Sequence, residues 1–254
     1  MKNVKPDSND NAAEFQWQSD DVFGRIAGRY DLLCDVFSLG IHRLWKRRVA
    51  AVIAQEPWGV LLDGATGTGD IILRVLPQLQ GEKRHIMAAD LSPSMLAIAE
   101  RRLQKHSTEV SLRTLDAQCM QGIADASVDA YSLSLALKIC KRQAVLQEAW
   151  RVLKPGGRLI VLEASNIRWP LVHRLYLAYM SLCMPMLGWI ATGGDASAYK
   201  YLLQGIRDFP SAEQLADELT AIGFEDVSFE RLSLGIVAIH TARKTRAPAN
   251  HSWA

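Results

Sequence analysis

The chain has 254 residues, of which 49% are hydrophobic and 22% are charged. This composition excludes a disordered or fibrous protein and supplies enough apolar material for a large globular core. The formal net charge is only +2, so the sequence lacks the concentrated basic charge of a dedicated nucleic-acid binder. We therefore expect no nucleic-acid partner.

The four cysteines, Cys34, Cys119, Cys140 and Cys183, are isolated in the sequence. None has the Cys-x-x-Cys spacing of a zinc site or a redox dithiol, so neither a metal site nor a disulfide is predicted. Residues 1–21 are polar and acidic, which is not the pattern of a secretory signal or a transit peptide. We predict a cytoplasmic protein with a polar N-terminal tail.

A helical segment, residues 22–54, is predicted to form a lid before the first strand. Strand-like runs then alternate with helical patterns, which is typical of a parallel sheet covered by helices. Ser92 and Pro93 are expected to open one helix, and Gln143–Leu153 to form another that ends at a Lys154–Gly157 turn. The predicted strands of this region are Val60–Asp63, His85–Asp90, Val110–Leu115, Val128–Leu135 and Arg158–Glu163.

Residues 175–194 carry no charge. Pro185 and the Gly193-Gly194 pair interrupt this stretch, and a proline in its middle would kink a membrane-spanning helix. The stretch therefore favours a buried or surface-docking pair of helices over a transmembrane span.

The last elements follow the uncharged stretch. Ser211 and Gln214 have the spacing of a capping box, which predicts a helix that ends at Gly223. Two alternating runs, Val227–Leu232 and Ile236–Thr241, predict an antiparallel hairpin at the edge of the sheet. The sequence thus predicts one α/β domain over residues 22–244, with a mostly parallel seven-stranded sheet, and a C-terminal tail over residues 245–254.

A glycine-rich loop, Asp63-Gly64-Ala65-Thr66-Gly67-Thr68-Gly69-Asp70, follows the first strand. Its glycines let the backbone pass close to a ligand, and Asp90, at the end of the next strand, can accept both hydroxyls of a ribose. The loop lacks the third glycine of a dinucleotide site, and Asp70 stands where a phosphate would lie. A cationic, nucleotide-like ligand is favoured, and S-adenosylmethionine carries both a sulfonium and an ammonium.

Longer segments resemble the UbiE family of ubiquinone/menaquinone C-methyltransferases, which are class I S-adenosylmethionine-dependent enzymes. The resemblance covers residues 22–244 and implies a Rossmann-like class I methyltransferase fold. The segments that carry it are Tyr30-Asp31-Leu32-Leu33, residues 38–46 (SLGIHRLWK), residues 151–158 (RVLKPGGR), Val161-Leu162-Glu163 and residues 235–240 (GIVAIH).

The resemblance implies that Thr68, Asp90, the Asp116-Ala117 pair and Ser134 contact the cofactor, beside the loop residues Asp63, Gly67 and Gly69. A carboxylate at Asp116, after the third strand, can accept the adenine amino hydrogen, and Ser134 ends the fourth strand beside the crevice. Two structural alternatives are open: Asp116 could cap a loop, and Ser134 could be a half-buried strand hydroxyl.

The chain departs from the family pattern at two places. Lys138-Ile139 follows the fourth strand where the family has Arg-Asn, a pair implicated in activation of the ring acceptor, and Cys34 replaces a usual Asn. Lysine cannot reproduce a bidentate guanidinium, and isoleucine has no amide. The departures therefore concern the acceptor rather than the cofactor.

Methylation of a quinol ring carbon requires deprotonation of the adjacent hydroxyl. Tyr30, Asp31, His42 and Lys138 are the candidate catalytic residues. The structural alternative is that His42 packs the N-terminal helices and that Asp31 pairs with Arg29 or caps a helix.

The predicted activity is S-adenosylmethionine-dependent C-methylation of an isoprenoid-bearing acceptor. A prenylated quinol is the favoured acceptor. The uncharged stretch would wall an apolar acceptor pocket or dock on the inner face of a membrane, and a homodimer is allowed. Other activities stay open: an NAD-dependent oxidoreductase, a noncatalytic cofactor-binding partner, and methylation of a prenyl diphosphate alkene. The cations available for a diphosphate are Arg25, Arg29, Lys138, Lys141 and Arg142.

Overall fold

The computed structural model describes residues 27–79, 84–106, 109–192 and 197–246. The predicted tail over residues 1–21, the start of the predicted lid, Arg25, the Gly193-Gly194 pair and most of the predicted C-terminal tail lie outside these residues.

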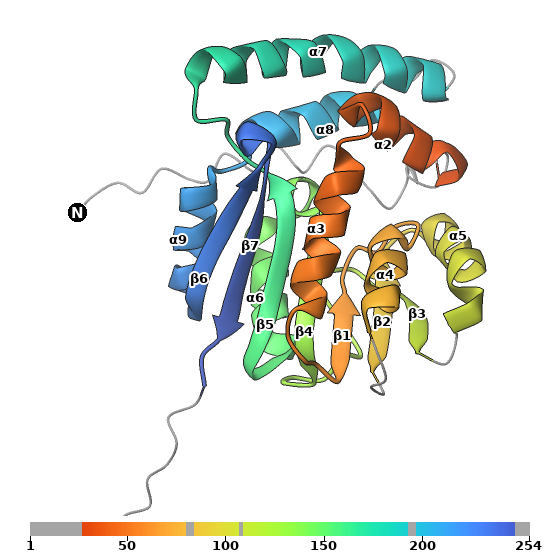
Figure 1. Ribbon diagram of the computed structural model, residues 1–254, viewed down its shortest axis with the longest axis vertical. Helices are drawn as coiled ribbons and strands as arrows, with labels where there is room; N and C mark the ends of the chain where they lie inside the picture. Colours follow the sequence, from red (N-terminus) through yellow and green to blue (C-terminus); the bar gives the residue numbers. More distant parts are fainter. Residues whose placement is uncertain (1–26, 80–83, 107–108, 193–196, 247–254) are drawn as a thin grey trace, which may run out of the picture.

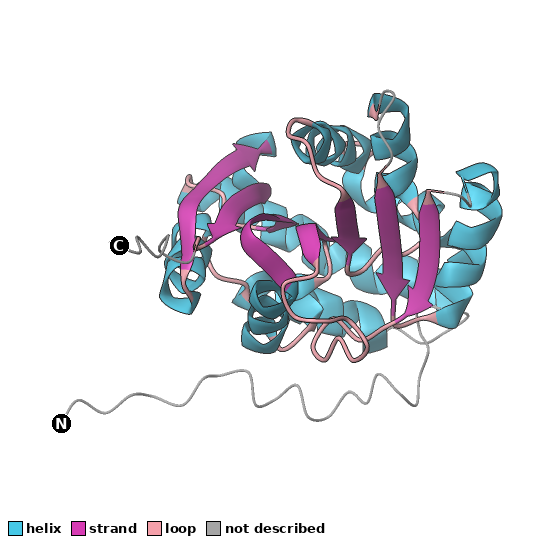
Figure 2. Ribbon diagram, turned by 90° about the horizontal axis from the view of Figure 1, so that it is seen from below, coloured by secondary structure: helices cyan, strands magenta, loops and turns pink. Residues whose placement is uncertain are grey.

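A seven-stranded sheet runs through the molecule in the order β3-β2-β1-β4-β5-β7-β6, with helices on both faces (Figure 2). Strands β1 to β5 pair in parallel, and β7 is antiparallel to both of its neighbours, β5 and β6. This confirms the predicted sheet and its C-terminal hairpin. The strands are β1 (Val60–Asp63), β2 (His85–Asp90), β3 (Val110–Thr114), β4 (Val128–Ser134), β5 (Leu153–Ala164), β6 (Phe224–Leu232) and β7 (Val237–Lys244).

Two strands begin earlier than predicted because bulges lie near their first residues. The residues predicted as the Lys154–Gly157 turn belong to β5, whose pairing with β4 shifts between Val128 and Ala130. Strand β6 begins at Phe224, before a second shift in its pairing with β7. A bulge places extra residues in one strand without ending it, so turn residues such as glycine do not mark the strand boundary here.

The predicted N-terminal lid is not one helix. In the described residues it consists of a 3₁₀ turn (Ala27–Arg29), α2 (Tyr30–Ser38) and α3 (His42–Ala54). Leu39 adopts a left-handed conformation with φ 51°, and the Gly40 N–H donates to the Asp35 carbonyl at 2.8 Å. This termination frees α3 to pack on the sheet while α2 crosses above it.

Two of the other helices, α5 and α9, have the predicted caps. The Ser92 hydroxyl accepts the Met95 N–H at the start of α5, Ser211 and Gln214 form the capping box of α9, and Gly223 ends α9 in a left-handed conformation. The remaining helices of the described residues are α4 (Asp70–Val75), α5 (Pro93–Leu103), α6 (Arg142–Val152), α7 (Pro170–Thr192), α8 (Ser197–Asp208) and α9 (Ala212–Ile222).

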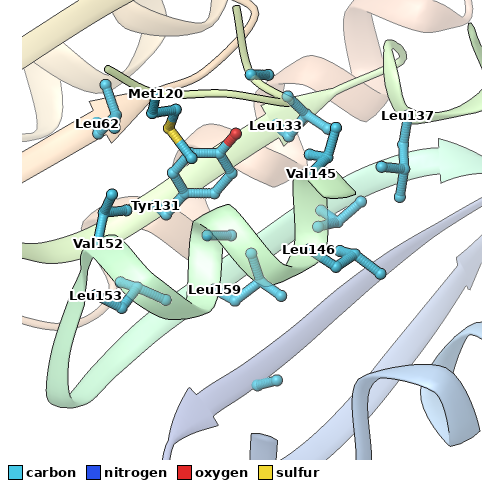
Figure 3. Close-up of a cluster of buried hydrophobic side chains, with 14 of the residues drawn as sticks. Leu62, Met120, Tyr131, Leu133, Leu137, Val145, Leu146, Val152, Leu153 and Leu159 are labelled. Carbon is cyan, nitrogen blue, oxygen red and sulfur yellow. The ribbon is translucent and has the colours of Figure 1, made fainter. Parts of the chain in front are cut away.

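Alternate residues of the central strands enter hydrophobic clusters on opposite faces of the sheet. Figure 3 shows Tyr131 of β4 within one cluster, beside Met120, Leu62 and Val152. The Tyr131 hydroxyl has no hydrogen-bond partner among the residues that the structure describes, and a Cβ at Gly64 would lie only 2.2 Å from it. Position 64 therefore has no room for a side chain, and the core itself fixes the path of the glycine loop above β4.

Helices α2, α7 and α8 lie beyond the carboxyl ends of β1 and β5 (Figure 1). Their inward side chains form a smaller apolar cluster centred on Met180, Met184 and Leu203. Helix α8 also approaches a 3₁₀ turn, η5 (Leu137–Ile139), so closely that a Cβ at Gly205 would lie 2.7 Å from the Lys138 carbonyl oxygen. Among the described residues, no helix has both the length and the apolar composition needed to cross a membrane.

Candidate active site

Asp90 connects the glycine loop to the end of the second strand. Its carboxylate accepts the Gly67 N–H at 2.8 Å on one oxygen and the Ser92 N–H at 2.9 Å on the other. Each carboxylate oxygen has a further lone pair that can accept a ribose hydroxyl. The structure therefore brings Gly67 and Asp90 together as predicted, and Asp90 also holds the loop in shape.

Asp63 lies beneath the loop and is fully buried. One carboxylate oxygen accepts the Ser132 hydroxyl at 2.7 Å, and the other has no hydrogen-bond partner of good geometry among the described residues. Burial raises the pKa of Asp63 to about 6, although the hydroxyls of Ser132 and Thr66 oppose this shift. A buried carboxylate of this kind is stabilised by a cation placed near it.

Ser134 ends β4 at the same edge of the sheet, and its buried hydroxyl finds no hydrogen-bond partner within the described part of the chain. The next residue, Leu135, has φ 58°, a left-handed conformation that costs a leucine about 1–3 kcal/mol. Its N–H donates to the Leu162 carbonyl at 2.7 Å, which fixes this turn. Ser134 thus offers an unsatisfied hydroxyl on a strained turn, as functional sites often do.

Asp116 closes a turn after β3. Its carboxylate accepts the Gln118 N–H at 2.8 Å and the Gln118 side-chain amide at 3.2 Å, and Ala117 is buried. The loop-cap alternative therefore describes the contacts of Asp116 in this structure. A carboxylate can accept several hydrogen bonds, so a cofactor role remains a proposal.

Asp70 does not supply the free negative charge that the sequence argument assigned to it. Its carboxylate is neutralised by Lys46 at 3.0 Å, Arg74 at 3.2 Å and Arg102 at 3.5 Å. Burial opposes ionisation, but these cations outweigh it and hold the pKa of Asp70 below its usual value. The electrostatic preference for a cationic ligand therefore rests on Asp63 and Asp90.

Asp31 of α2 contacts the glycine loop from above. The Thr68 hydroxyl donates to one Asp31 oxygen at 3.1 Å, and Arg102 donates to the other at 2.8 Å. Arg102 also donates to the Thr68 hydroxyl at 2.9 Å. We call these three residues the α2 latch, because they fasten α2 to the loop and to α5.

Tyr30 is the first residue of α2 and lies beside the apolar cluster of α7 and α8. It packs against that cluster, and its pKa is raised well above the usual value by Cys34, by burial, and by Asp90 and Asp31. Burial also raises the pKa of Cys34, while Lys46 and Lys138 act in the opposite direction. Cys34 and Lys138, which both depart from the family pattern, are thus electrostatic neighbours.

Lys138 forms a buried ion pair with Glu163 of β5. The ammonium donates to a Glu163 oxygen at 3.0 Å and to the Leu135 carbonyl. Glu163 also accepts the Lys138 N–H at 3.1 Å and the Ala164 N–H at 2.7 Å. The pair fixes the segment after β4, and it leaves the ammonium one further N–H to donate.

His42 lies at the corner between α2 and α3. Its Nδ1 is 2.8 Å from the Ser38 hydroxyl and 3.7 Å from the Asp35 carboxylate. Burial, followed by Lys46, lowers the pKa of His42. Because these contacts join α2 to α3, they favour the structural alternative for His42.

Sequence reasoning missed Glu163, Arg102 and Gly205 as members of this region. Glu163 carried a detectable signal, since it is an acid within an otherwise apolar strand end. Arg102 and Gly205 carried none, because their partners are distant in sequence and only the packing of α5 and α8 brings them together.

The site fits S-adenosylmethionine. Asp90 can accept ribose hydroxyls, the second oxygen of Asp63 suits a cation, and the Ser134 hydroxyl has no hydrogen-bond partner among the described residues. An NAD-dependent enzyme is not favoured, because the loop lacks the third glycine of a dinucleotide site. The fold and the site together define an S-adenosylmethionine-dependent methyltransferase of class I.

Comparisons with known proteins specify the family. A sequence model of the ubiE/COQ5 methyltransferase family matches residues 11–244, and the chain belongs to this family. A protein of Rhizobium meliloti named ubiquinone/menaquinone biosynthesis C-methyltransferase UbiE is 39% identical over 229 residues, which are 88% of each chain. A protein of the same name from Acidiphilium cryptum is 38% identical over 87% of this chain and 88% of its own.

The fold is also similar to solved structures. A SAM-dependent methyltransferase from Thermotoga maritima superposes with a TM-score of 0.62 at 20% identity, over 89% of this chain and 99% of that protein. The [4+2]-cyclase SpnF superposes with a TM-score of 0.59 at 22% identity, over 79% of this chain and 81% of SpnF. These two likenesses concern the fold.

The glycines of the loop are expected to respond differently to substitution. Gly67 has φ 54° and open space around its Cβ position, whereas a Cβ at Gly69 would lie 3.0 Å from Leu103 and 3.4 Å from Ala99. Valine is strained at the positive φ of either residue, 54° at Gly67 and 79° at Gly69. Gly67→Val should abolish cofactor binding with a small loss of stability, and Gly69→Val, which also meets Leu103, should lower affinity and lose more stability. Calorimetric titration and thermal unfolding of each variant measure the two effects, and normal affinity of Gly67→Val would show that the loop is not the cofactor cradle.

Proposed function

We propose that this methyltransferase transfers a methyl group from S-adenosylmethionine to a ring carbon of a prenylated quinol, either demethylmenaquinol or a polyprenyl-benzoquinol. The observation that carries the proposal is the apolar cluster of α2, α7 and α8, against which Tyr30 packs at the start of α2 while the charge of Asp90 acts on its hydroxyl. The relatives named for ubiquinone/menaquinone biosynthesis support the same acceptor class.

An isoprenoid acceptor suits the apolar cluster that α2, α7 and α8 form on their inward sides. Tyr176, Met180 and Met184 of α7 pack with Leu203 of α8 and Phe37 of α2. Such flexible and aromatic side chains accommodate an apolar tail by repacking. The ring of the acceptor would then lie toward Tyr30 and Lys138, and its prenyl chain would extend among α2, α7 and α8.

We assign the polar chemistry of the acceptor to Lys138. The remaining N–H of its ammonium can donate to the quinol oxygen and stabilise it as a phenolate, while the hydroxyl proton passes to water. Glu163 orients the ammonium through their ion pair. When bound, S-adenosylmethionine supplies the electrophilic methyl group on its sulfonium.

Tyr30 and Asp31 serve this reaction by position. The raised pKa of Tyr30 keeps its hydroxyl protonated, so it acts as a hydrogen-bond donor rather than as a base. Asp31 holds α2 over the loop through the latch. Thr68, Asp116 and Ala117 complete the cofactor side of the proposal.

A prenyl diphosphate would meet only part of the predicted cation set in a free state. Arg142 is bound by Glu218 through contacts of 2.6 and 2.8 Å, and Lys138 is bound by Glu163. The exposed Arg29 and Lys141 pair with no carboxylate among the described residues, so free cations alone do not decide between the two acceptors. The preference for the quinol is supported by the relatives named for ubiquinone/menaquinone biosynthesis.

The proposal is tested by offering the purified protein labelled S-adenosylmethionine with quinols and prenyl diphosphates in parallel. Mass spectrometry of the products should find a methyl group on the quinol ring. Methylation of the prenyl diphosphate with no quinol product would replace the proposed acceptor, and cofactor binding without turnover of any acceptor in a complementing extract would contradict enzymatic activity.

Restoring the family residues is expected to change acceptor preference and to leave cofactor affinity within about twofold. The first variant combines Lys138→Arg with Ile139→Asn, and the second adds Cys34→Asn. The arginine keeps a cation beside Glu163, because an unpaired buried carboxylate would cost about 3–5 kcal/mol of stability. The ratio of kcat/KM for two quinols should change about tenfold or more, because that factor corresponds to the free energy of one hydrogen bond to a charged group. Equal preferences in wild type and variant would mean that these departures are neutral.

A further inference from the structure

The outward face of α7 is apolar although it is exposed to solvent. Leu171, Leu175 and Leu182 have exposed fractions of 69%, 63% and 72%, and the exposed Ala178 lies between them. Their spacing of three or four residues places them along one side of a helix. Figure 1 shows α7 as the outermost helix, beyond α8 and α2.

The inward face of α7 is already occupied. Tyr176, Met180 and Met184 point into the cluster that α7 shares with α2 and α8. Over the described side chains α7 is therefore apolar on both faces, whereas a surface helix normally presents polar residues to water. A row of exposed leucines of this kind marks an interaction surface.

The groups that flank the leucines select the kind of partner. Arg168 and Arg174 are exposed, and neither pairs with a carboxylate among the described residues. Trp169 and Tyr179 are also exposed, at 59% and 39%, and α7 contains no acidic residue. Leucines flanked by arginines and amphipathic aromatic rings are typical of helices that lie in a membrane interface.

A second copy of the chain fits this face less well. In a symmetric dimer centred on the leucine row the same surface meets itself, so Arg174 of α7 would approach the partner's Arg174. Since α7 has no acid, no carboxylate on the helix would compensate the repulsion. Anionic lipid headgroups supply the missing negative charge at the depth where Arg168 and Arg174 would lie.

We propose that the outward face of α7 docks on the surface of a bilayer that contains anionic lipids. Leu171, Leu175 and Leu182 enter the boundary of the acyl chains, and Arg168 and Arg174 contact the headgroups. The inference deepens the proposed function and rests on it, because a prenylated acceptor resides in the bilayer and the opposite face of the same helix encloses the acceptor site. Docking thus places the membrane against α7, whose other face borders the proposed acceptor site.

Flotation with phospholipid vesicles tests this surface. Wild type should float with vesicles of phosphatidylcholine and phosphatidylglycerol, and Leu175→Glu or Leu182→Glu should reduce the bound fraction at least tenfold. Arg168→Gln and Arg174→Gln should each weaken binding about fivefold and reduce its salt dependence. Leu44→Glu is the matched control, since Leu44 is a similarly exposed leucine, at 59%, on α3.

The variants are first checked for unchanged thermal stability and cofactor affinity, because their side chains point away from the site. A loss of binding as large in Leu44→Glu as in Leu175→Glu would overturn the assignment to α7. A dimer detected by light scattering that Leu175→Glu dissociates, without any vesicle binding, would assign the face to a second copy instead.

Turnover of two acceptors separates this inference from the proposed function. A short-chain quinol in solution should be methylated equally by wild type and Leu175→Glu, whereas a long-chain quinol in vesicles should be methylated only by wild type. Methylation of the short-chain quinol without vesicle binding would refute docking and leave the quinol proposal intact. Vesicle binding without methylation of either quinol would refute the acceptor proposal and leave the docking surface intact.

Discussion

Replacing Asp90 with alanine is expected to weaken S-adenosylmethionine binding by about 3–6 kcal/mol, because two hydrogen bonds to a charged group contribute about 1.5–3 kcal/mol each. Asp90 ends β2 and lies against the glycine loop, where its carboxylate also accepts the Gly67 and Ser92 N–H groups. Calorimetric titration of the purified variant measures the loss.

The structural role of Asp90 requires a control. Asp90→Asn keeps one oxygen acceptor and should lose less affinity than the alanine variant. Thermal unfolding of both apoproteins shows how much of the effect comes from the loop, since Asp90→Ala leaves the Gly67 and Ser92 N–H groups unpaired. Unchanged affinity for S-adenosylmethionine in a folded Asp90→Ala protein would contradict the prediction that Asp90 binds the ribose.

The free energy of unfolding of the apoprotein is expected to depend on Asp63 between about pH 4 and pH 6. The unfolded pKa is 3.8 and burial raises the folded pKa to about 6, so the folded state keeps its proton over this range while the unfolded state loses it. The stability from Asp63 is fully present below pH 3.8 and is lost as pH rises to about 6. The loss amounts to about 3 kcal/mol on the linkage relation.

Cofactor binding should show the opposite dependence on pH. A nearby cation favours the ionised form of Asp63, so affinity should rise as pH increases toward and past about 6. Asp63→Asn removes both trends while it keeps an oxygen for the Ser132 hydroxyl. Urea unfolding and calorimetric titration across this range test the assignment, and parallel pH profiles of wild type and Asp63→Asn would contradict it.

Local signals were sufficient to predict most of the fold. The buried strands β1 and β2 have the predicted bounds, and Ser92, Ser211 and Gly223 end or begin helices as predicted. The bulges near Gly156 and Asp226 were not predictable, because they depend on the register of the neighbouring strand rather than on the residues themselves. The break at Leu39 was missed because leucine rarely adopts a positive φ.

The cofactor side of the site was more predictable than the acceptor side. Asp63, Gly67 and Asp90 lie at strand ends and in a loop whose order in the sequence reflects their order in the sheet. The ion pair of Lys138 with Glu163 and the α2 latch depend on helix packing. No local pattern encodes such contacts, so sequence reasoning named Lys138 without a partner. For Asp31 it offered Arg29, whereas the structure pairs Asp31 with Arg102 and Thr68.

The position of β7 in the sheet determines when the sheet can be completed during synthesis. Strand β7 is the last to be made, yet it lies between β5 and β6 and pairs with both. At about 5–20 residues per second, β5 exposes an unpaired edge for several seconds before β7 leaves the ribosome. Such an edge can pair with another chain, so β7, the final strand, also removes a site of aggregation when it inserts between β5 and β6.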